Sequence, residues 1–357
     1  MTYSFKNFDW VLLGGILVLA AASLLSLFSS STALFYRQLV WYVAAIIVIV
    51  GGSRFDWRGI VSQTYFRQGL YWFSIILLII VSLQSETVRG VKSWLQFGGF
   101  EFQPAELAKL SLILILAGFF SRRYVAAWLG KNIALSFFYT ALPAVLVVIQ
   151  PDFGSAAVIF AIWLGFLLTS GVNKKRLFFG IIIAILVFTF LWVSYLRPYQ
   201  KERIIGFLNP NADQLGINYN VVQSKIAIGS AGFWGKGFGS GSQVQLGFLP
   251  EAETDFLFAA FVEEWGVFGG AIVILAFLLI LYRIIKIGIG ASNNDSKFIV
   301  LGLALVLTVQ FFINIGSNLG ILPVTGINFP FLSYGGSSIL TLSVLMSIIQ
   351  KIKIESH

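Results

Sequence analysis

The sequence predicts an all-α integral membrane protein with about ten transmembrane helices, arranged as a single polytopic membrane domain over residues 1–357. Hydrophobic residues make up 58% of the chain, more than a water-soluble domain of this length could bury. Apolar segments long enough to cross a hydrocarbon core of ~30 Å recur from one end to the other. Lys and Arg gather at alternate ends of these segments, which is typical of membrane helices with a fixed orientation.

The predicted spans follow one another from the N-terminus. The first lacks a cleavage site of small residues, so we expect a retained helix rather than a removed signal peptide. Pro104 opens the fourth span, because proline is tolerated at the first position of a helix. The eighth span begins directly after Asp255, where a polar loop gives way to an apolar run. The ten spans are 10–28, 35–51, 69–83, 105–120, 133–149, 155–171, 177–196, 256–282, 298–318 and 337–349.

The basic residues predict the orientation. One set of span ends carries 15 of the 24 Lys and Arg residues and few acids. These residues are Lys6, Arg54, Arg58, Arg67, Arg122, Arg123, Lys131, Lys174, Lys175, Arg176, Arg283, Lys286, Lys297, Lys351 and Lys353. The positive-inside rule places such ends, and with them both termini, in the cytoplasm. The large loop 197–255, between the seventh and eighth spans, is then extracytoplasmic, as are the shorter loops 84–104, 150–154 and 319–336.

Composition excludes several kinds of chemistry. The chain has no cysteine and a single histidine, His357, at its last position. Disulfides, thiolate metal sites and histidine-based triads are therefore not expected. Acid–base chemistry must run on Asp and Glu, helped by Lys, Arg or a bound cation. The net charge of +9 fits the positive-inside rule and attraction to anionic lipid, and without a soluble basic domain no nucleic-acid binding is expected.

Two motifs place charged residues at membrane level. Glu106 and Lys109 lie three residues apart in FQPAELAKL, so they share a helix face and can pair. Such a pair either orients two helices or borders a polar cavity. Asp152 lies in QPDFGSA between two spans with almost no loop. It either caps the following helix or is a second acid facing the same cavity.

The large outer loop holds two candidate anion sites. The first is the basic run RPYQKER, with Arg197, Lys201 and Arg203, which either binds a lipid phosphate or is a solvated charge run. The second is the glycine-serine segment GKGFGSGS, which either binds an anion through its backbone N–H groups or is simply a flexible loop. Its candidate residues are Lys236, Gly239, Ser240, Gly241 and Ser242.

Asp255 is the strongest candidate for catalysis. It is the last acid of the segment LPEAETDFLF and directly precedes the eighth span, and an ionised carboxylate loses hydration as it approaches hydrocarbon. The alternative is helix capping by Thr254 or Asp255. Asp255 and Glu253 could also hold a divalent cation, Mg²⁺ or Mn²⁺, while Glu263 lies deeper on a similar face and could tune Asp255. The last outer loop, which includes FPFLSYGGSS, has the irregular polar character of a cavity lining.

Together FQPAELAKL, QPDFGSA, the glycine-serine segment, LPEAETDFLFA and FPFLSYGGSS resemble the SEDS family (shape, elongation, division and sporulation). The resemblance covers essentially the whole chain, with the motifs in the family's order. Short tails make it more similar to RodA-like elongation proteins than to the division protein FtsW. The resemblance implies a peptidoglycan glycosyltransferase of the cytoplasmic membrane, which polymerises lipid II into β-1,4 glycan strands at the outer face during cell-wall elongation and cell-shape maintenance.

The resemblance also implies roles for single residues. The family's essential aspartate matches Asp255, its intramembrane pair matches Glu106 and Lys109, its short-loop aspartate matches Asp152, and a loop arginine matches Arg203 less closely. An inverting reaction with Asp255 as general base would follow. The leaving pyrophosphate would be stabilised by Lys109, Arg197, Lys201, Arg203, Lys236 and residues 239–242, or by Mg²⁺ or Mn²⁺, without an organic cofactor. Expected partners are a class B penicillin-binding protein, which is a transpeptidase, and other membrane proteins of the elongation complex.

Two other functions use the same features. A flippase or transporter for lipid II would also need polar residues within spans and basic sites for pyrophosphate. Against it, the polar groups gather on the outer side and no inverted repeat is evident. A non-catalytic scaffold for the transpeptidase would tolerate alanine at Asp255 while depending on its helix surfaces.

Overall fold

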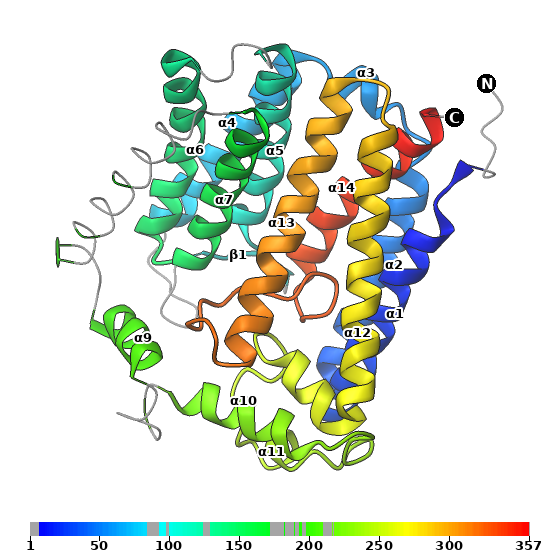
Figure 1. Cartoon of the computed structure of the whole chain (residues 1–357), viewed down its shortest axis with the longest axis vertical. Coiled ribbons are helices and arrows are strands. Elements are labelled where there is room, and N and C mark those ends of the chain that lie inside the picture. The colour runs from blue at the N-terminus through cyan, green and yellow to red at the C-terminus, as the bar shows by residue number, and fades with distance from the viewer. Residues whose placement is uncertain are drawn as a thin grey trace.

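The computed structural model is a bundle of long helices (Figure 1). It describes residues 7–83, 93–97, 100–123, 129–171, 182, 189, 193–194, 198–209, 216 and 218–356. Within these residues, 8 helices are long and apolar enough to cross a membrane, and a shorter apolar helix adds to them. The predicted span 177–196 lies outside the described residues apart from isolated positions. The membrane-length helices confirm a multi-pass membrane protein of the predicted class.

The membrane helices match the predicted spans closely. They are α1 (Trp10–Ser30), α2 (Thr32–Gly52), α4 (Thr64–Leu83), α5 (Pro104–Arg123), α6 (Gly130–Ile149), the shorter α7 (Phe153–Thr169), α12 (Leu257–Gly290), α13 (Asn294–Asn318) and α14 (Gly336–Glu355). Several helices run a few residues past the predicted ends, because Lys and Arg stems can extend beyond the apolar core and keep their charges in water.

Helix α5 forms the centre of the bundle. It packs against α4, α6, α7, α13 and α14, and 89% of the residues in its 18-residue apolar stretch are buried. By contrast, only 22% of the residues in the corresponding stretch of α2 are buried. The exposed side chains of α2 are mostly apolar, as expected for a surface that faces lipid. Charged side chains on α5 therefore have no route to water along most of the helix and need partners inside the protein.

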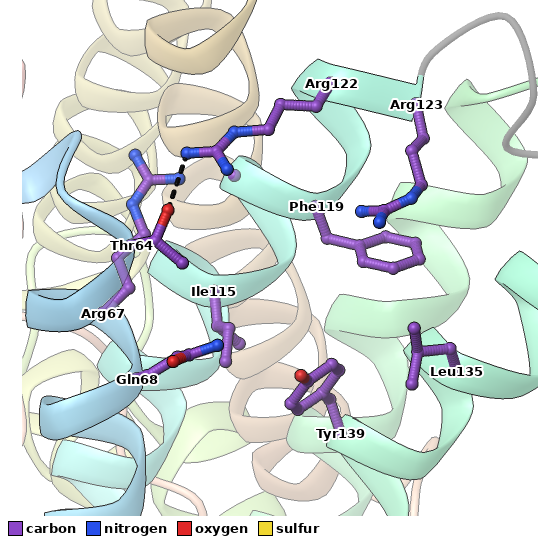
Figure 2. A pocket seen from close by; sticks show the side chains of 10 residues that line it. Thr64, Arg67, Gln68, Ile115, Phe119, Arg122, Arg123, Leu135 and Tyr139 are labelled. Carbon is purple, nitrogen blue, oxygen red and sulfur yellow. Dashed lines mark hydrogen bonds between the residues drawn. The ribbon is translucent and has the colours of Figure 1, made fainter.

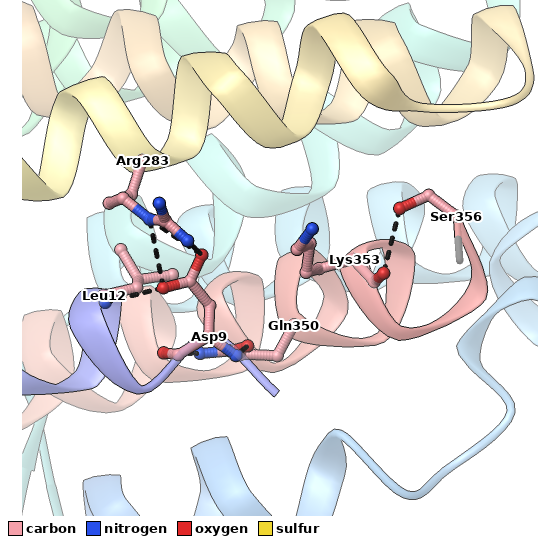
Figure 3. Close-up of polar contacts among 6 residues, drawn as sticks. All are labelled: Asp9, Leu12, Arg283, Gln350, Lys353 and Ser356. Atoms are coloured by element: carbon pink, nitrogen blue, oxygen red, sulfur yellow. Dashed lines mark hydrogen bonds and ion pairs between the residues drawn. The ribbon is translucent and has the colours of Figure 1, made fainter. Parts of the chain in front are cut away.

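Three helices are tied together at the basic end of the bundle (Figure 3). Asp9 caps α1 by accepting a hydrogen bond from the Leu12 N–H at 2.9 Å. Its buried carboxylate also pairs with Arg283 of α12, with the Nε of Arg283 2.9 Å from Oδ2. Gln350 of α14 donates to the Asp9 carbonyl at 3.0 Å. The start of α1 and the end of α14 lie at this same end, as the predicted orientation requires (Figure 1).

The loops contain structure that the sequence did not predict. The large loop 197–255 includes α9 (Pro198–Leu208), α10 (Tyr219–Ser230) and α11 (Ser242–Gln245), and the segment 53–63 includes α3 (Trp57–Val61). The loop before α5 forms a hairpin of β1 (Leu95–Phe97) and β2 (Phe100–Phe102). These elements are too short for hydropathy to reveal. In Figure 1, α10 and α11 lie at the end opposite α3.

Helix α12, predicted as one continuous helix, is broken at Gly266, which has φ +72°. The segment before α11 fills the break. The N–H groups of Lys236 and Gly237 donate to the carbonyls of Glu263 and Glu264, each at 3.0 Å. These are carbonyls that a regular helix would bond internally. The break is tolerated at membrane depth because the polar groups that it releases have partners in this loop.

Candidate active site

Asp255 lies half-buried immediately before α12, and its backbone is held by α13. Its carbonyl accepts hydrogen bonds from the side-chain amides of Asn314 at 3.0 Å and Asn318 at 2.9 Å. The cap residue of α12 is Phe256, which makes no side-chain cap bond, and the Ala259 N–H donates to Asn318 Oδ1 at 3.1 Å. Asn318 therefore caps α12, whereas the alternative considered from the sequence was capping by Thr254 or Asp255.

The last outer loop, residues 319–335, packs against the acidic segment. The Tyr334 N–H donates to the Glu253 carbonyl at 3.0 Å, and the Ser333 hydroxyl donates to the Thr254 carbonyl at 2.6 Å. Gly326 approaches the catalytic candidate itself, because a Cβ built there would lie 4.0 Å from Asp255 Oδ2. Its φ of +76° favours glycine independently of space. The loop thus forms one wall beside the Asp255 carboxylate.

Helix α2 fixes the other side of this loop. Gln38 donates to the Ser333 carbonyl at 3.2 Å, and the Tyr42 hydroxyl donates to the Phe331 carbonyl at 2.9 Å. Both side chains are buried on a helix that is otherwise mostly exposed. The loop is therefore held between α2 and the acidic segment, so its irregular backbone finds partners on both sides.

Glu106 and Lys109 form the pair that their spacing predicted. Lys109 Nζ lies 2.7 Å from Glu106 Oε1, and both side chains are buried in α5. Gln103, one turn earlier, joins two other elements. Its amide donates to Asp152 Oδ2 at 3.0 Å, and its N–H donates to the Ser337 hydroxyl at 3.1 Å. The start of α5 is thus connected to the starts of α7 and α14.

Asp152 caps α7, as one alternative predicted, and it also interacts electrostatically with the Glu106–Lys109 pair, while its place in a polar cavity stays a prediction. Its Oδ1 accepts from the Ser155 N–H at 2.9 Å. Burial raises the pKa of its carboxyl above the ordinary value, against hydrogen bonds from Ser155 and the charge of Lys109, which lower it. Two residues on, a Cβ at Gly154 would lie 2.5 Å from the Thr325 carbonyl. Residues 325–327 therefore touch both the Asp152 turn and the Asp255 side.

The glycine-serine segment is bonded to glutamates of α12. Lys236 Nζ lies 2.6 Å from Glu263 Oε1, which also accepts from the Gln243 N–H at 3.0 Å. The Gly239 N–H donates to Glu264 Oε1 at 3.2 Å. Ser242 donates to Glu263 at 3.2 Å. An external anion would have to compete with Glu263 and Glu264 for these donors, and Glu263 is engaged here rather than facing Asp255.

The basic run of the outer loop is placed only in part. Lys201 is half-buried on α9, which lies at the edge of the molecule in Figure 1. Arg203 belongs to the same helix, but its side chain lies outside the described set, and Arg197 lies outside the described residues. Their predicted contact with a phosphate stays a prediction.

The predicted cation would have Asp255 and Glu253 as its protein ligands. Both carry carboxylate oxygens, which Mg²⁺ and Mn²⁺ prefer. Among the described residues, no group of three or more His, Cys, Asp or Glu side chains could hold a metal ion. Magnesium is commonly held by one or two carboxylates together with substrate phosphates, so the residues fit that arrangement rather than a complete protein cage.

Two residues that position the site were not singled out from the sequence. Gln38 lies alone in an apolar span, with no spacing pattern to mark it, although a glutamine at membrane depth is itself a signal. Gln103 lies in the motif FQPAELAKL, in which the charged residues Glu106 and Lys109 give the stronger signal. Both are side-chain amides, which can donate and accept at once and so join loops to helices.

Comparison with known proteins gives consistent relatives. The family model for cell cycle proteins FtsW, RodA and SpoVE matches residues 3–357. The peptidoglycan glycosyltransferase MrdB of Escherichia coli K12 is 37% identical over 283 residues, which is 79% of this chain and 76% of MrdB. FtsW of Coxiella burnetii is 34% identical over 351 residues, covering 96% of this chain and 93% of that protein.

Solved structures share the fold. A chain from a peptidoglycan synthase complex, studied for its structural coordination of polymerization and crosslinking, superposes with a TM-score of 0.84 at 29% identity, covering 98% of both chains. The rod shape determining protein RodA of Thermus thermophilus superposes with a TM-score of 0.72 at 24% identity, covering 98% of this chain and 97% of RodA.

Proposed function

We propose, from the premise that this chain belongs to the SEDS family and is a peptidoglycan glycosyltransferase, that Asp255 is the general base of its polymerisation reaction. The observation that carries this proposal is the position of Asp255. Its backbone is fixed by Asn314 and Asn318, and the loop that borders its carboxylate also touches the turn of Asp152. A single loop therefore runs from the turn of Asp152 to the carboxylate of Asp255.

The proposed substrate is lipid II, a disaccharide-peptide linked to undecaprenyl pyrophosphate. The 4-hydroxyl of one GlcNAc attacks the anomeric MurNAc carbon of another unit. The new C–O bond forms as the bond to pyrophosphate breaks, so the α-linked donor gives a β-1,4 product by inversion. The alcohol is a poor nucleophile at neutral pH, and the Asp255 carboxylate accepts its proton during the attack. No covalent enzyme intermediate is needed.

The departing pyrophosphate needs positive charge. Lys109 is the best placed basic residue among those described, because it is buried beside Asp152 and its ammonium group pairs with Glu106 at 2.7 Å. Arg197, Lys201 and Arg203 would add charge from the outer loop. Lys236 is less suited, since it is paired with Glu263. A divalent cation held by Asp255 and Glu253 would supply further charge neutralisation at the pyrophosphate when bound.

The test is polymerisation of purified fluorescent lipid II by the full-length protein. Asp255→Asn should lower the rate by about a hundredfold or more, because general-base catalysis contributes that much, while thermal unfolding stays near wild type. Glu251→Gln removes a neighbouring carboxylate without a proposed role and should leave the rate within about twofold. An Asp255→Asn enzyme with wild-type turnover would rule out the base. An EDTA arm with Mg²⁺ or Mn²⁺ rescue measures the cation requirement.

We also propose a class B penicillin-binding protein as partner, an extracytoplasmic reaction and a role in elongation. The structural likeness to a synthase complex supports the partner, and the basic residues at the opposite end support the sidedness. The fold shared with a rod shape determining protein motivates the elongation role. Co-purification with the transpeptidase and restoration of rod shape in a strain lacking its elongation polymerase test these. Restoration of division alone would contradict the elongation role.

A further inference from the structure

A cavity of about 190 Å³ opens at the basic end of the bundle, between α4, α5 and α6 (Figure 2). It is far along the bundle from Asp255, at the end where α4 begins and α5 terminates. Its lining combines three arginines with apolar and aromatic side chains. The arginines are Arg67, Arg122 and Arg123, and the apolar and aromatic residues are Ile115, Phe119, Leu135 and Tyr139.

The cavity carries excess positive charge. Arg67 pairs with Asp295 at 2.5 Å, whereas Arg122 donates to the Thr64 hydroxyl at 2.9 Å and the Arg123 guanidinium lies 4.6 Å from the centroid of the Phe119 ring. In the part of the chain that the structure describes, no carboxylate pairs with Arg122 or Arg123. The sequence that follows, 124–131, contains a lysine and no acid.

The arginine wall is built into the helices. The Arg67 side chain is only 4% exposed, donates to the Val61 carbonyl and contacts α5 at Gly118. Any Cβ at Gly118 would overlap the Arg67 guanidinium, so the absence of a side chain there makes room for the charge. Arg67 and Arg122 both line the cavity, as Figure 2 shows. Several guanidinium groups lining one cavity favour an anion, which they can bind through charge-assisted hydrogen bonds.

We propose that this cavity binds the phosphate of an anionic phospholipid from the cytoplasmic leaflet. Arg122 and Arg123 contact the phosphate, Arg67 adds its charge from the wall, and the glycerol and upper acyl chain lie on the apolar lining. The acyl chain then continues along the lipid-facing side of α4, where Trp72, Phe73 and Ile76 are exposed. A phosphate ester without an acyl chain would use the arginines but leave the apolar lining uncovered.

The test measures binding of phosphatidylglycerol and phosphatidylcholine, with identical acyl chains, to the purified full chain by native mass spectrometry. Wild type should prefer phosphatidylglycerol. Arg122→Gln/Arg123→Gln should weaken phosphatidylglycerol binding about tenfold or more, since two charge-assisted contacts with the phosphate would be lost together. The matched control is Lys286→Gln/Lys297→Gln, which removes two exposed charges that do not line the cavity. It should change binding less than twofold.

Two further arms separate the possible outcomes. Leu135→Trp fills the apolar lining without changing charge and should also weaken phosphatidylglycerol binding, so the proposal stays testable if the arginine variant fails to fold. If the arginine and lysine double variants weakened phosphatidylglycerol binding equally, only general attraction to the surface would be shown, and the site would be overturned. The absence of a preference for phosphatidylglycerol in wild type would have the same meaning. Displacement of phosphatidylglycerol by inorganic phosphate at low millimolar concentration would identify a soluble phosphate ester and overturn the lipid assignment.

Discussion

Glu106 and Lys109 are two formal charges inside the bundle, 2.7 Å apart and at most 7% exposed. Each depends on the other, because an isolated charge on the central helix would be left without water or a counter-ion. Lys109→Met should therefore lower the free energy of unfolding by about 3 kcal/mol or more, measured by thermal or denaturant unfolding in detergent.

The double variant separates stability from catalysis. Glu106→Met/Lys109→Met removes both charges and should recover most of the lost stability, since apolar replacement of a buried pair is often nearly neutral. Its polymerase activity should stay low if Lys109 supports the leaving pyrophosphate. Recovery of activity together with stability would assign the pair a structural role alone.

The sequence predicted the charged residues of the site better than its amides. Asp255, Asp152 and the Glu106–Lys109 pair stand out because carboxylates and ammonium groups at membrane depth are costly. Gln38 and Gln103 do not, since a single amide has no spacing rule and its role depends on loops that fold beside it. The ion pair between Lys236 and Glu263 could not be predicted from the sequence either, because the two residues come together only through the break in α12.

At the level of elements, the broken helix α12 makes a specific demand on Gly266. Its φ of +72° is strained for other residues, and a Cβ there would overlap the Phe233 carbonyl. Gly266→Ala should lower the free energy of unfolding by about 2 kcal/mol or more. It should also speed hydrogen exchange at the Lys236 and Gly237 amides, which bond across the break.

The control for this prediction is Gly69→Ala in α4, where an added Cβ would meet nothing within 4 Å. Alanine is the better helix former at such a site, so stability should stay the same or rise slightly. Equal losses for the two variants would contradict the strain argument. The sequence could not single out Gly266 from Gly269 and Gly270 nearby, because only the loop packed on it decides which glycine takes the positive φ.

Across the whole molecule, the ends of the chain are joined through Asp9, Arg283 and Gln350, which link α1, α12 and α14. The Asp9 side chain is fully buried. Asp9→Asn should lower the free energy of unfolding by about 3 kcal/mol, as expected for breaking a buried pair. Arg58→Gln breaks the pair with Glu355 at the same end, where Arg58 is 47% exposed, and should cost about 0.5 kcal/mol or less. Unfolding in detergent compares the two, and similar losses would contradict the effect of burial.

The overall plan of the molecule was predictable, but its internal arrangement was not. Every predicted span that falls on described residues coincides with a helix, because the thickness of the bilayer fixes how long an apolar run must be. The sidedness rests on Lys and Arg alone and stays a prediction. Hydropathy does not distinguish α5 from α2, although 89% of the 18-residue apolar stretch of α5 is buried and only 22% of that of α2. That difference arises from packing between spans of similar apolar character.

The two asparagine bonds to the Asp255 carbonyl have a consequence for how a long polymer is made. They anchor the segment of Asp255 to α13, so the proposed proton acceptor keeps its place from one sugar addition to the next. Repeated addition then requires the growing strand to slide forward by a disaccharide while the protein frame stands still. Processivity in this chain would be a matter of product translocation past a stationary carboxylate.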